Sequence, residues 1–197
     1  KELIRQNQGA AAAGAGGLGA VVLGTKTGRA LAGQAIKLGG LALIGGLAYK
    51  ALQNYQAGKP IISGVMPDLA EAPRGSGFET AAVTQQAAVT YLKIAAAADG
   101  RIDANEQQKI LGNMKQLGVG PEGEEFLANE LNNPATAEQL AQGVSTEEEA
   151  VQLFTAARIA VDLDTEEEHA FLVALAQALG IDGKLANHID ATARAAA

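Results

Sequence analysis

A stretch rich in proline and glycine divides this chain of 197 residues into two unlike parts. Residues 58–77 read GKPIISGVMPDLAEAPRGSG and contain three prolines and four glycines, the residue types that most often interrupt helices and strands. We predict that this stretch is a linker without regular structure. It separates a Gly/Ala-rich segment at residues 1–57 from a domain at residues 78–197 that we expect to fold on its own.

The sequence after the linker has the apolar spacing of consecutive helices. Aromatic residues make up 4% of the chain and Trp is absent, so the core must be built from Ala, Leu, Ile and Val. This composition favours helices over a sheet, because Ala is the best helix former and strands prefer β-branched and aromatic residues. We therefore predict an all-α protein, with a bundle of about seven helices after the linker and a helical segment before it.

Start signals place most of these helices. Two helices are expected at residues 79–98 and 104–117, and the others are expected to begin near Pro121, Asn133, Ser145, Asp164 and Asp182. Ser145 with Glu148, and Asp164 with Glu167, have the spacing of capping boxes. The apolar faces expected for these two helices consist of Ala150, Phe154, Ala157 and Val161, and of Phe171, Leu172, Leu175 and Leu179.

Small residues recur at every fourth position in the first segment. The stripe consists of Ala12, Gly16, Ala20, Gly24, Gly28 and Ala32, and Ala42 with Gly46 repeats the spacing. In membranes such stripes let helices approach closely, so we predict membrane attachment and self-association into a homo-oligomer. The apolar runs at residues 9–24 and 38–49 are shorter than the ~20 residues that cross a bilayer, so each would be the centre of a longer, tilted or interfacial helix. A flexible tail and a secretory signal peptide are the alternatives.

Charge is distributed unevenly between the two parts. Residues 1–77 carry a balance of +5, whereas residues 78–197 carry seven basic and nineteen acidic residues, a balance of −12. A domain this acidic repels phosphate backbones, so we expect no nucleic acid partner. The basic, apolar first part instead suits an anionic membrane lipid surface.

In residues 94–106, IAAAADGRIDANE, the part from Asp99 onward resembles the second half of a calcium-binding EF-hand loop. Ala95 and Ala97 stand where that loop needs its first oxygen ligands, so a normal EF-hand site is excluded. Asp103 and Glu106 instead have the spacing of a capping box that opens the following helix.

Residues 162–167, DLDTEE, repeat this pattern of an acid at the end of one helix and Asp-x-x-Glu at the start of the next. The two copies suggest two helical hairpins that pack face to face. If they do, Asp99, Asp103, Asp162 and Asp164 could converge, and clustered carboxylates repel one another unless a cation or a proton relieves them. A divalent-cation site is therefore one interpretation, and helix capping on a solvated acidic surface is the one we favour.

The sequence has no recognisable catalytic apparatus. It lacks cysteine, and its two histidines have no metal-binding spacing. His169 is expected to be a half-buried packing residue rather than a base, because no nucleophile has a recognisable context near it. We therefore expect a non-catalytic interaction or scaffold module with a protein partner still to be identified, and we consider an enzyme unsupported.

Two stretches resemble known families. AAAADGRIDANEQQKIL and ARIAVDLDTEEEHAFLVALAQALGI resemble TerB-like (tellurite-resistance) domains, and GGLGAVVLGTKTGRALAGQAIKLGGLALIGGLAYKALQNYQ resembles the N-terminal region of the YebE-like bacterial inner-membrane family. The resemblance implies a location at the bacterial inner membrane and a role in envelope or metal-stress response. It also implies a divalent cation as a candidate ligand. By position, the metal-binding residues would be Asp99, Asp103, Glu106, Asp162, Asp164 and Glu167.

A cation titration distinguishes capping from metal binding. If the acidic motifs only cap helices, Mg²⁺ or Ca²⁺ leaves the melting temperature of residues 78–197 nearly unchanged beyond ionic-strength effects, which is the result we expect. A true site would stabilise the fold by about 2.7 kcal/mol at a hundredfold excess over Kd. Asp99→Asn is the informative variant, since capping explains Asp99 least. An ion-specific shift that disappears in Asp99→Asn would contradict our expectation.

Overall fold

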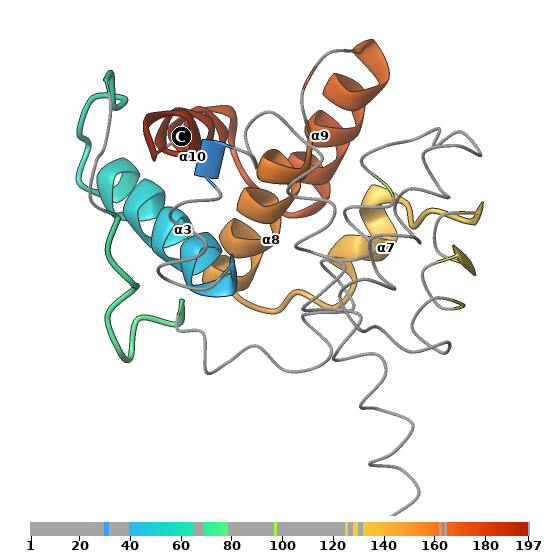
Figure 1. Ribbon diagram of the computed structural model, residues 1–197, viewed down its shortest axis with the longest axis horizontal. Coiled ribbons are helices and arrows are strands. Elements are labelled where there is room, and N and C mark those ends of the chain that lie inside the picture. Colours follow the sequence, from blue (N-terminus) through green and yellow to red (C-terminus); the bar gives the residue numbers. More distant parts are fainter. Residues whose placement is uncertain are drawn as a thin grey trace, which may run out of the picture.

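The computed structural model describes residues 30–31, 40–64, 69–78, 97, 125, 128–129, 132–161, 163 and 165–196. Within these ranges the protein is all-α and contains no strand (Figure 1). The helices are α3 (Gly40–Gln56), α7 (Ala137–Ala141), α8 (Glu147–Ala160), α9 (Glu166–Ala178) and α10 (Gly183–Ala196). The helices predicted at residues 79–98 and 104–117, and the start predicted at Pro121, fall almost entirely outside the described residues.

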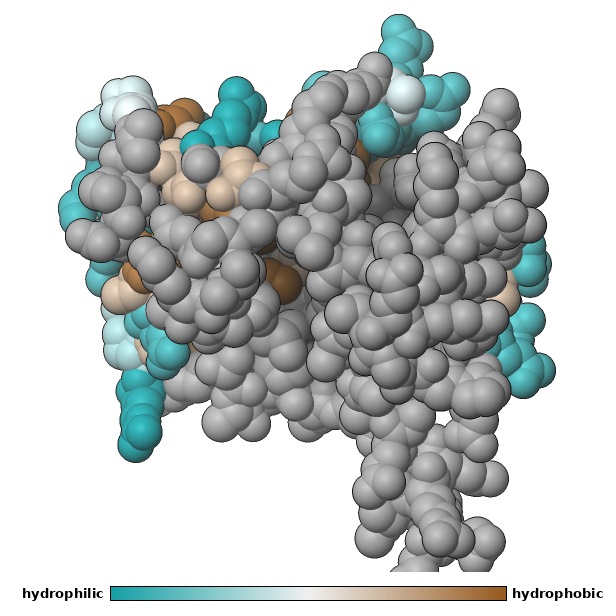
Figure 2. Space-filling view, viewed as in Figure 1, coloured by the Kyte–Doolittle hydropathy of each residue, from teal (hydrophilic) through white to brown (hydrophobic). Residues whose placement is uncertain are grey.

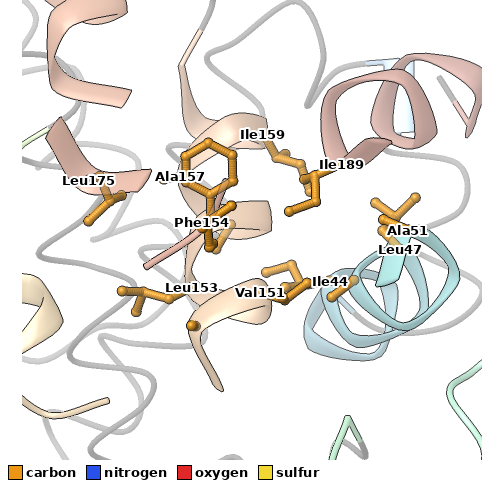
Figure 3. Close-up of a cluster of buried hydrophobic side chains, with 14 of the residues drawn as sticks. Ile44, Leu47, Ala51, Val151, Leu153, Phe154, Ala157, Ile159, Leu175 and Ile189 are labelled. Atoms are coloured by element: carbon orange, nitrogen blue, oxygen red, sulfur yellow. The ribbon is translucent and has the colours of Figure 1, made fainter. Parts of the chain in front are cut away.

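Helix α8 lies at the centre of this arrangement. It packs against α3, α9 and α10, and nine of the ten positions from Ala150 to Ile159 are buried, Gln152 being the exception. Val151 and Ile159 face α3 and α10, whereas Leu153 lies on the side of Leu175 in α9 (Figure 3). The apolar face predicted for α8 is buried as expected, and the burial extends around the helix because neighbours cover both of its sides.

Helices α8 and α9 begin with the same four residues, Thr-Glu-Glu-Glu. Thr146 Oγ1 accepts from the backbone N–H of Glu149 at 3.2 Å, and the Glu149 carboxylate accepts from the Thr146 N–H at 3.3 Å. Thr165 and Glu168 make the same reciprocal pair at 3.2 and 2.7 Å. Each capping box thus lies one residue later than predicted. The later register puts all three glutamates in the first turn, where the positive end of the helix dipole stabilises them.

Of the predicted starts of α7 and α10, the first was wrong and the second is confirmed. The helix predicted to begin at Asn133 begins at Ala137, because Thr136 and Gln139 form a capping box of their own. Asp182 caps α10 as predicted, since its Oδ1 accepts from the backbone N–H groups of Lys184 and Leu185 at 2.7 and 2.9 Å.

Helix α3, from the Gly/Ala-rich segment, packs against α8 and α10. Its residues Leu43, Ile44, Leu47 and Ala48 belong to the same buried cluster as α8. Among the described residues, no helix combines the length and the apolar character needed to cross a membrane. The stripe from Ala12 to Ala32 lies almost entirely outside the described residues, and the independent folding of residues 78–197 stays a prediction.

The predicted linker contains no helix in its described residues after Gln56, and residues 69–78 run over α3 as a strap. Leu69 and Phe78 are buried, and the Phe78 ring meets Tyr49 of α3 edge-to-face with centroids 5.8 Å apart. Gln152 of α8 donates to the Gly77 carbonyl at 3.0 Å and fixes the end of the strap.

The strap approaches α3 where α3 has two consecutive glycines. A Cβ on Gly45 would lie 2.3 Å from the carbonyl oxygen of Phe78, and one on Gly46 would lie 2.5 Å from that of Ala70. Both neighbours are backbone atoms, which cannot move aside as a side chain can. The absence of a side chain at these two positions therefore allows the strap to seat.

Replacing Gly46 by Ala tests this contact. Although Ala is the better helix former by about 1 kcal/mol, we expect Gly46→Ala to lower the free energy of unfolding by about 1–3 kcal/mol, because the strap must shift. The matched control is Gly183→Ala, since no atom lies within 4 Å of a Cβ there. Denaturant unfolding followed by circular dichroism gives both values. Equal or greater stability in Gly46→Ala would show that the strap is not seated on α3.

Candidate functional site

Helices α9 and α10 are consecutive but diverge from the loop that joins them. Helix α9 packs against α7 and α8, α10 packs against α3 and α8, and α9 and α10 have no extended contact with each other (Figure 1). The space between them is an open groove of about 980 Å³, to which α8 and Tyr55 of α3 also contribute. This volume is at the upper end of the range typical of ligand sites.

Much of the groove lining is apolar. Phe154 of α8, Leu172 and Ala176 of α9 and Ile181 of the connecting loop contribute to it. On α9, Val173 also lines the groove and is 54% exposed, although it is a large apolar residue. An apolar wall beside water is the usual property of a binding surface.

At one end of the groove, Asp190 of α10 joins two arginines. Arg158 of α8 is buried, and its Nε donates to Asp190 Oδ1 at 2.5 Å while its Nη1 donates to the Val161 carbonyl at 3.0 Å. Arg194, one turn after Asp190 on α10, donates to the other carboxylate oxygen. The Arg194 side chain is 67% exposed, so this end of the groove presents a cation to solvent.

At the other end, Asp182 joins α3 to α10. Its Oδ2 accepts a hydrogen bond from the Tyr55 hydroxyl, while its Oδ1 caps α10. The hydrogen bond with Asp182 raises the pKa of Tyr55 above its ordinary value. The same bond, with the Leu185 N–H, lowers the pKa of Asp182. Both groups are therefore held in the charge states that they have at neutral pH.

The acidic residues proposed as metal ligands are only partly visible. Asp99, Asp103, Glu106, Asp162 and Asp164 lie outside the described residues. Glu167 lies exposed in the first turn of α9. In the described part of the chain, no three His, Cys, Asp or Glu side chains form a group that could hold a metal ion.

Leu163, between Asp162 and Asp164 in the sequence, has a φ of 57°. Among the described residues it is the only one other than glycine with a positive φ, a conformation that bulky residues rarely adopt. Its side chain lines the groove where the chain turns from α8 to α9.

His169 differs from the prediction. It lines the groove and is exposed rather than half-buried. His188 is the buried one: its ring meets Tyr55 edge-to-face at 5.9 Å, and its Nδ1 has no hydrogen-bond partner among the described residues. Its position on the apolar stripe of α10, between Leu185 and Thr192, was the available signal.

The Tyr55–Asp182 pair predicts a stability profile with two limits. Because the pKa of Asp182 is lowered from its ordinary value of 3.8, ionised Asp182 stabilises the fold at pH values above 3.8. This contribution is lost as the pH falls through the folded-state pKa. Because the pKa of Tyr55 is raised from its ordinary value of 10.0, the neutral Tyr55 hydroxyl stabilises the fold at pH values below 10.0. This contribution is lost as the pH rises through the folded-state pKa.

Tyr55→Phe should therefore reduce stability most at neutral pH and progressively less toward both extremes. Urea unfolding at stepped pH measures the difference from wild type. Asp182→Asn keeps an oxygen for the helix cap and serves as the companion variant. A Tyr55→Phe difference that is the same from acid to alkaline pH would contradict the pairing.

On the face drawn in Figure 2, the described outer edges are mostly hydrophilic, and hydrophobic residues show in small patches between them.

Comparison with known proteins gives a family. The chain is 32% identical over 107 residues to an "Uncharacterized protein in ampR 5'region" of Yersinia enterocolitica, an alignment covering 53% of this chain and 77% of that protein. No solved structure matches. The model of the family described as "Protein of unknown function (DUF533)" matches residues 7–193. Because that match covers nearly the whole sequence, the chain belongs to the DUF533 family.

Proposed function

We propose that this protein is a non-catalytic interaction module of the bacterial inner membrane that holds a partner in the groove between α9 and α10. The observation that carries the proposal is the divergence of these two consecutive helices. Helices joined by a short loop usually bury their apolar faces on each other. Here the space between them stays open and is lined by both apolar and charged residues.

The state of the ionisable groups favours binding over catalysis. A general acid or base works best with a pKa near the working pH, but the pKa of Tyr55 is raised and that of Asp182 is lowered, both away from neutrality. Asp190 is engaged by two arginines. These carboxylates act as parts of the framework that shapes the groove.

The membrane location rests on the first segment. Its balance of positive charge suits an anionic lipid surface, and its stripe of small residues suits close helix contact in a homo-oligomer. The resemblance to YebE-like inner-membrane proteins and to TerB-like domains supports the same location and a role in envelope or metal-stress response. The acidic domain argues against nucleic acid as the partner.

A cation-binding sensor is the second candidate. The observation that favours it is the left-handed backbone of Leu163, because residues in rare backbone conformations cluster at functional sites. Leu163 stands between Asp162 and Asp164, two of the six residues assigned by resemblance.

Photo-crosslinking in intact cells tests the interaction module. The two exposed large apolar residues in the described part of the chain are Val173, 54% exposed in the groove, and Ile61, 48% exposed outside it. A benzophenone side chain at Val173 should give a discrete adduct, whereas one at Ile61 should not. Val173 and Ile61 have similar exposed fractions, so the main difference between them is that Val173 lies in the groove and Ile61 does not. No adduct at either site, or the same adducts at both, would refute a binding groove.

A further inference from the structure

Three of the seven basic residues of the acidic domain lie at the groove. Three basic residues follow Lys115 in the sequence, Arg158, Lys184 and Arg194, and all three line the groove. Among the described residues of the lining, Asp182 and Asp190 are the two acids, so these three basic residues outnumber them by one. The domain around it carries a balance of −12. An excess of basic residues in the groove of an acidic domain suits an anionic ligand.

The charges lie at the two ends of the groove. Lys184 is in the first turn of α10 and Arg194 in the last, ten residues and about 15 Å apart along the helix. At the Arg194 end, Arg158 approaches from α8 through the shared Asp190. At the Lys184 end, Asp182 offsets the lysine charge. The Arg194 end is therefore the more cationic of the two.

At this end of the groove, the Arg194 guanidinium has further N–H donors beyond the one that Asp190 accepts. A guanidinium carries five N–H donors, and the Arg194 side chain uses Nη2 on Asp190 while remaining 67% exposed. Asp190 is itself fixed by the buried Arg158, so it holds Arg194 at the groove. A carboxylate or phosphate placed there can accept charge-assisted hydrogen bonds.

We propose that the groove binds an anionic amphiphile, with a single acyl chain along the apolar lining and a carboxylate or phosphate head group at Arg194. Phe154, Leu172 and Ala176 line the same groove and offer the chain an apolar surface. Because the exposed guanidinium of Arg194 lies at one end of the groove, the groove fits a ligand with one charged head. The inference rests on the proposed function, since it identifies the chemistry of the partner in the same groove.

Displacement of a fluorescent fatty acid from the full-length protein tests the proposal. Dansyl-undecanoate should gain fluorescence on binding, and dodecanoate and dodecyl phosphate should displace it, whereas dodecanol and dodecyltrimethylammonium should not. Lauroyl-lysophosphatidylglycerol then separates the two sources of the head group. Displacement by it indicates a phospholipid, and displacement by dodecanoate alone indicates a free fatty acid. Equal displacement by neutral, cationic and anionic chains would overturn the proposal.

Two pairs of variants locate the ligand. Arg194→Gln should weaken dodecanoate binding about tenfold, because it removes charge-assisted hydrogen bonds. Lys184→Gln removes the same charge from the same helix at the other end and should weaken binding much less. Val173→Glu should weaken binding, and Ile61→Glu should not. Equal losses in Arg194→Gln and Lys184→Gln would contradict the assigned head-group position.

The result also separates this inference from the proposed function. If none of these amphiphiles binds but a benzophenone at Val173 captures a protein in cells, the groove is an interaction site and the amphiphile proposal is wrong. If neither experiment detects binding, both proposals fail. Saturable binding of the anionic probes with the variant pattern above supports both.

Discussion

The buried guanidinium of Arg158 fixes the arrangement on which the groove depends. An unpaired charge in the interior costs several kcal/mol, so burial of Arg158 requires partners at defined positions. Its partners include the Val161 carbonyl at the end of α8 and Asp190 of α10. Together they hold the last turn of α8 against the middle of α10. Helix α9 packs with α7 on the other side of α8. Helices α9 and α10 therefore diverge from the loop that joins them and do not pack on each other. The groove is thus a consequence of where α8 places its charged end.

Helix α3 shows how one composition serves two different environments. Small residues permit close helix contact in a membrane, and they equally permit a close approach of irregular backbone in a globular core. Gly45 and Gly46 serve the second purpose, because carbonyl oxygens of the strap occupy the space where their side chains would be. The same helix buries Leu43 and Leu47 against the C-terminal helices. A glycine pattern alone therefore does not distinguish a membrane helix from a core helix that carries a strap.

The sequence was most informative where local chemistry decides the structure. The all-α class, the buried face of α8 and the cap at Asp182 were predictable from apolar spacing and from start signals. The capping boxes were predicted one residue early, because Ser145–Glu148 and Thr146–Glu149 have the same spacing and only the structure selects between them. The exposure of His169, and the groove itself, depend on the direction of α9. That direction arises from tertiary packing, which no local pattern encodes.

Screening by salt explains how an acidic domain can bind an anion in its groove. At physiological ionic strength the Debye length is about 8 Å, so exposed charges farther away contribute little to the energy of a bound head group. The long-range field of the domain still repels large polyanions, which present many charges at once. A single carboxylate or phosphate in the groove instead responds mainly to the charges beside it. Lys184 and Arg194 lie about 15 Å apart along α10, nearly twice the Debye length, so each acts on a ligand almost independently. Recognition in this groove is therefore set by the Arg158–Asp190–Arg194 group rather than by the net charge of the protein.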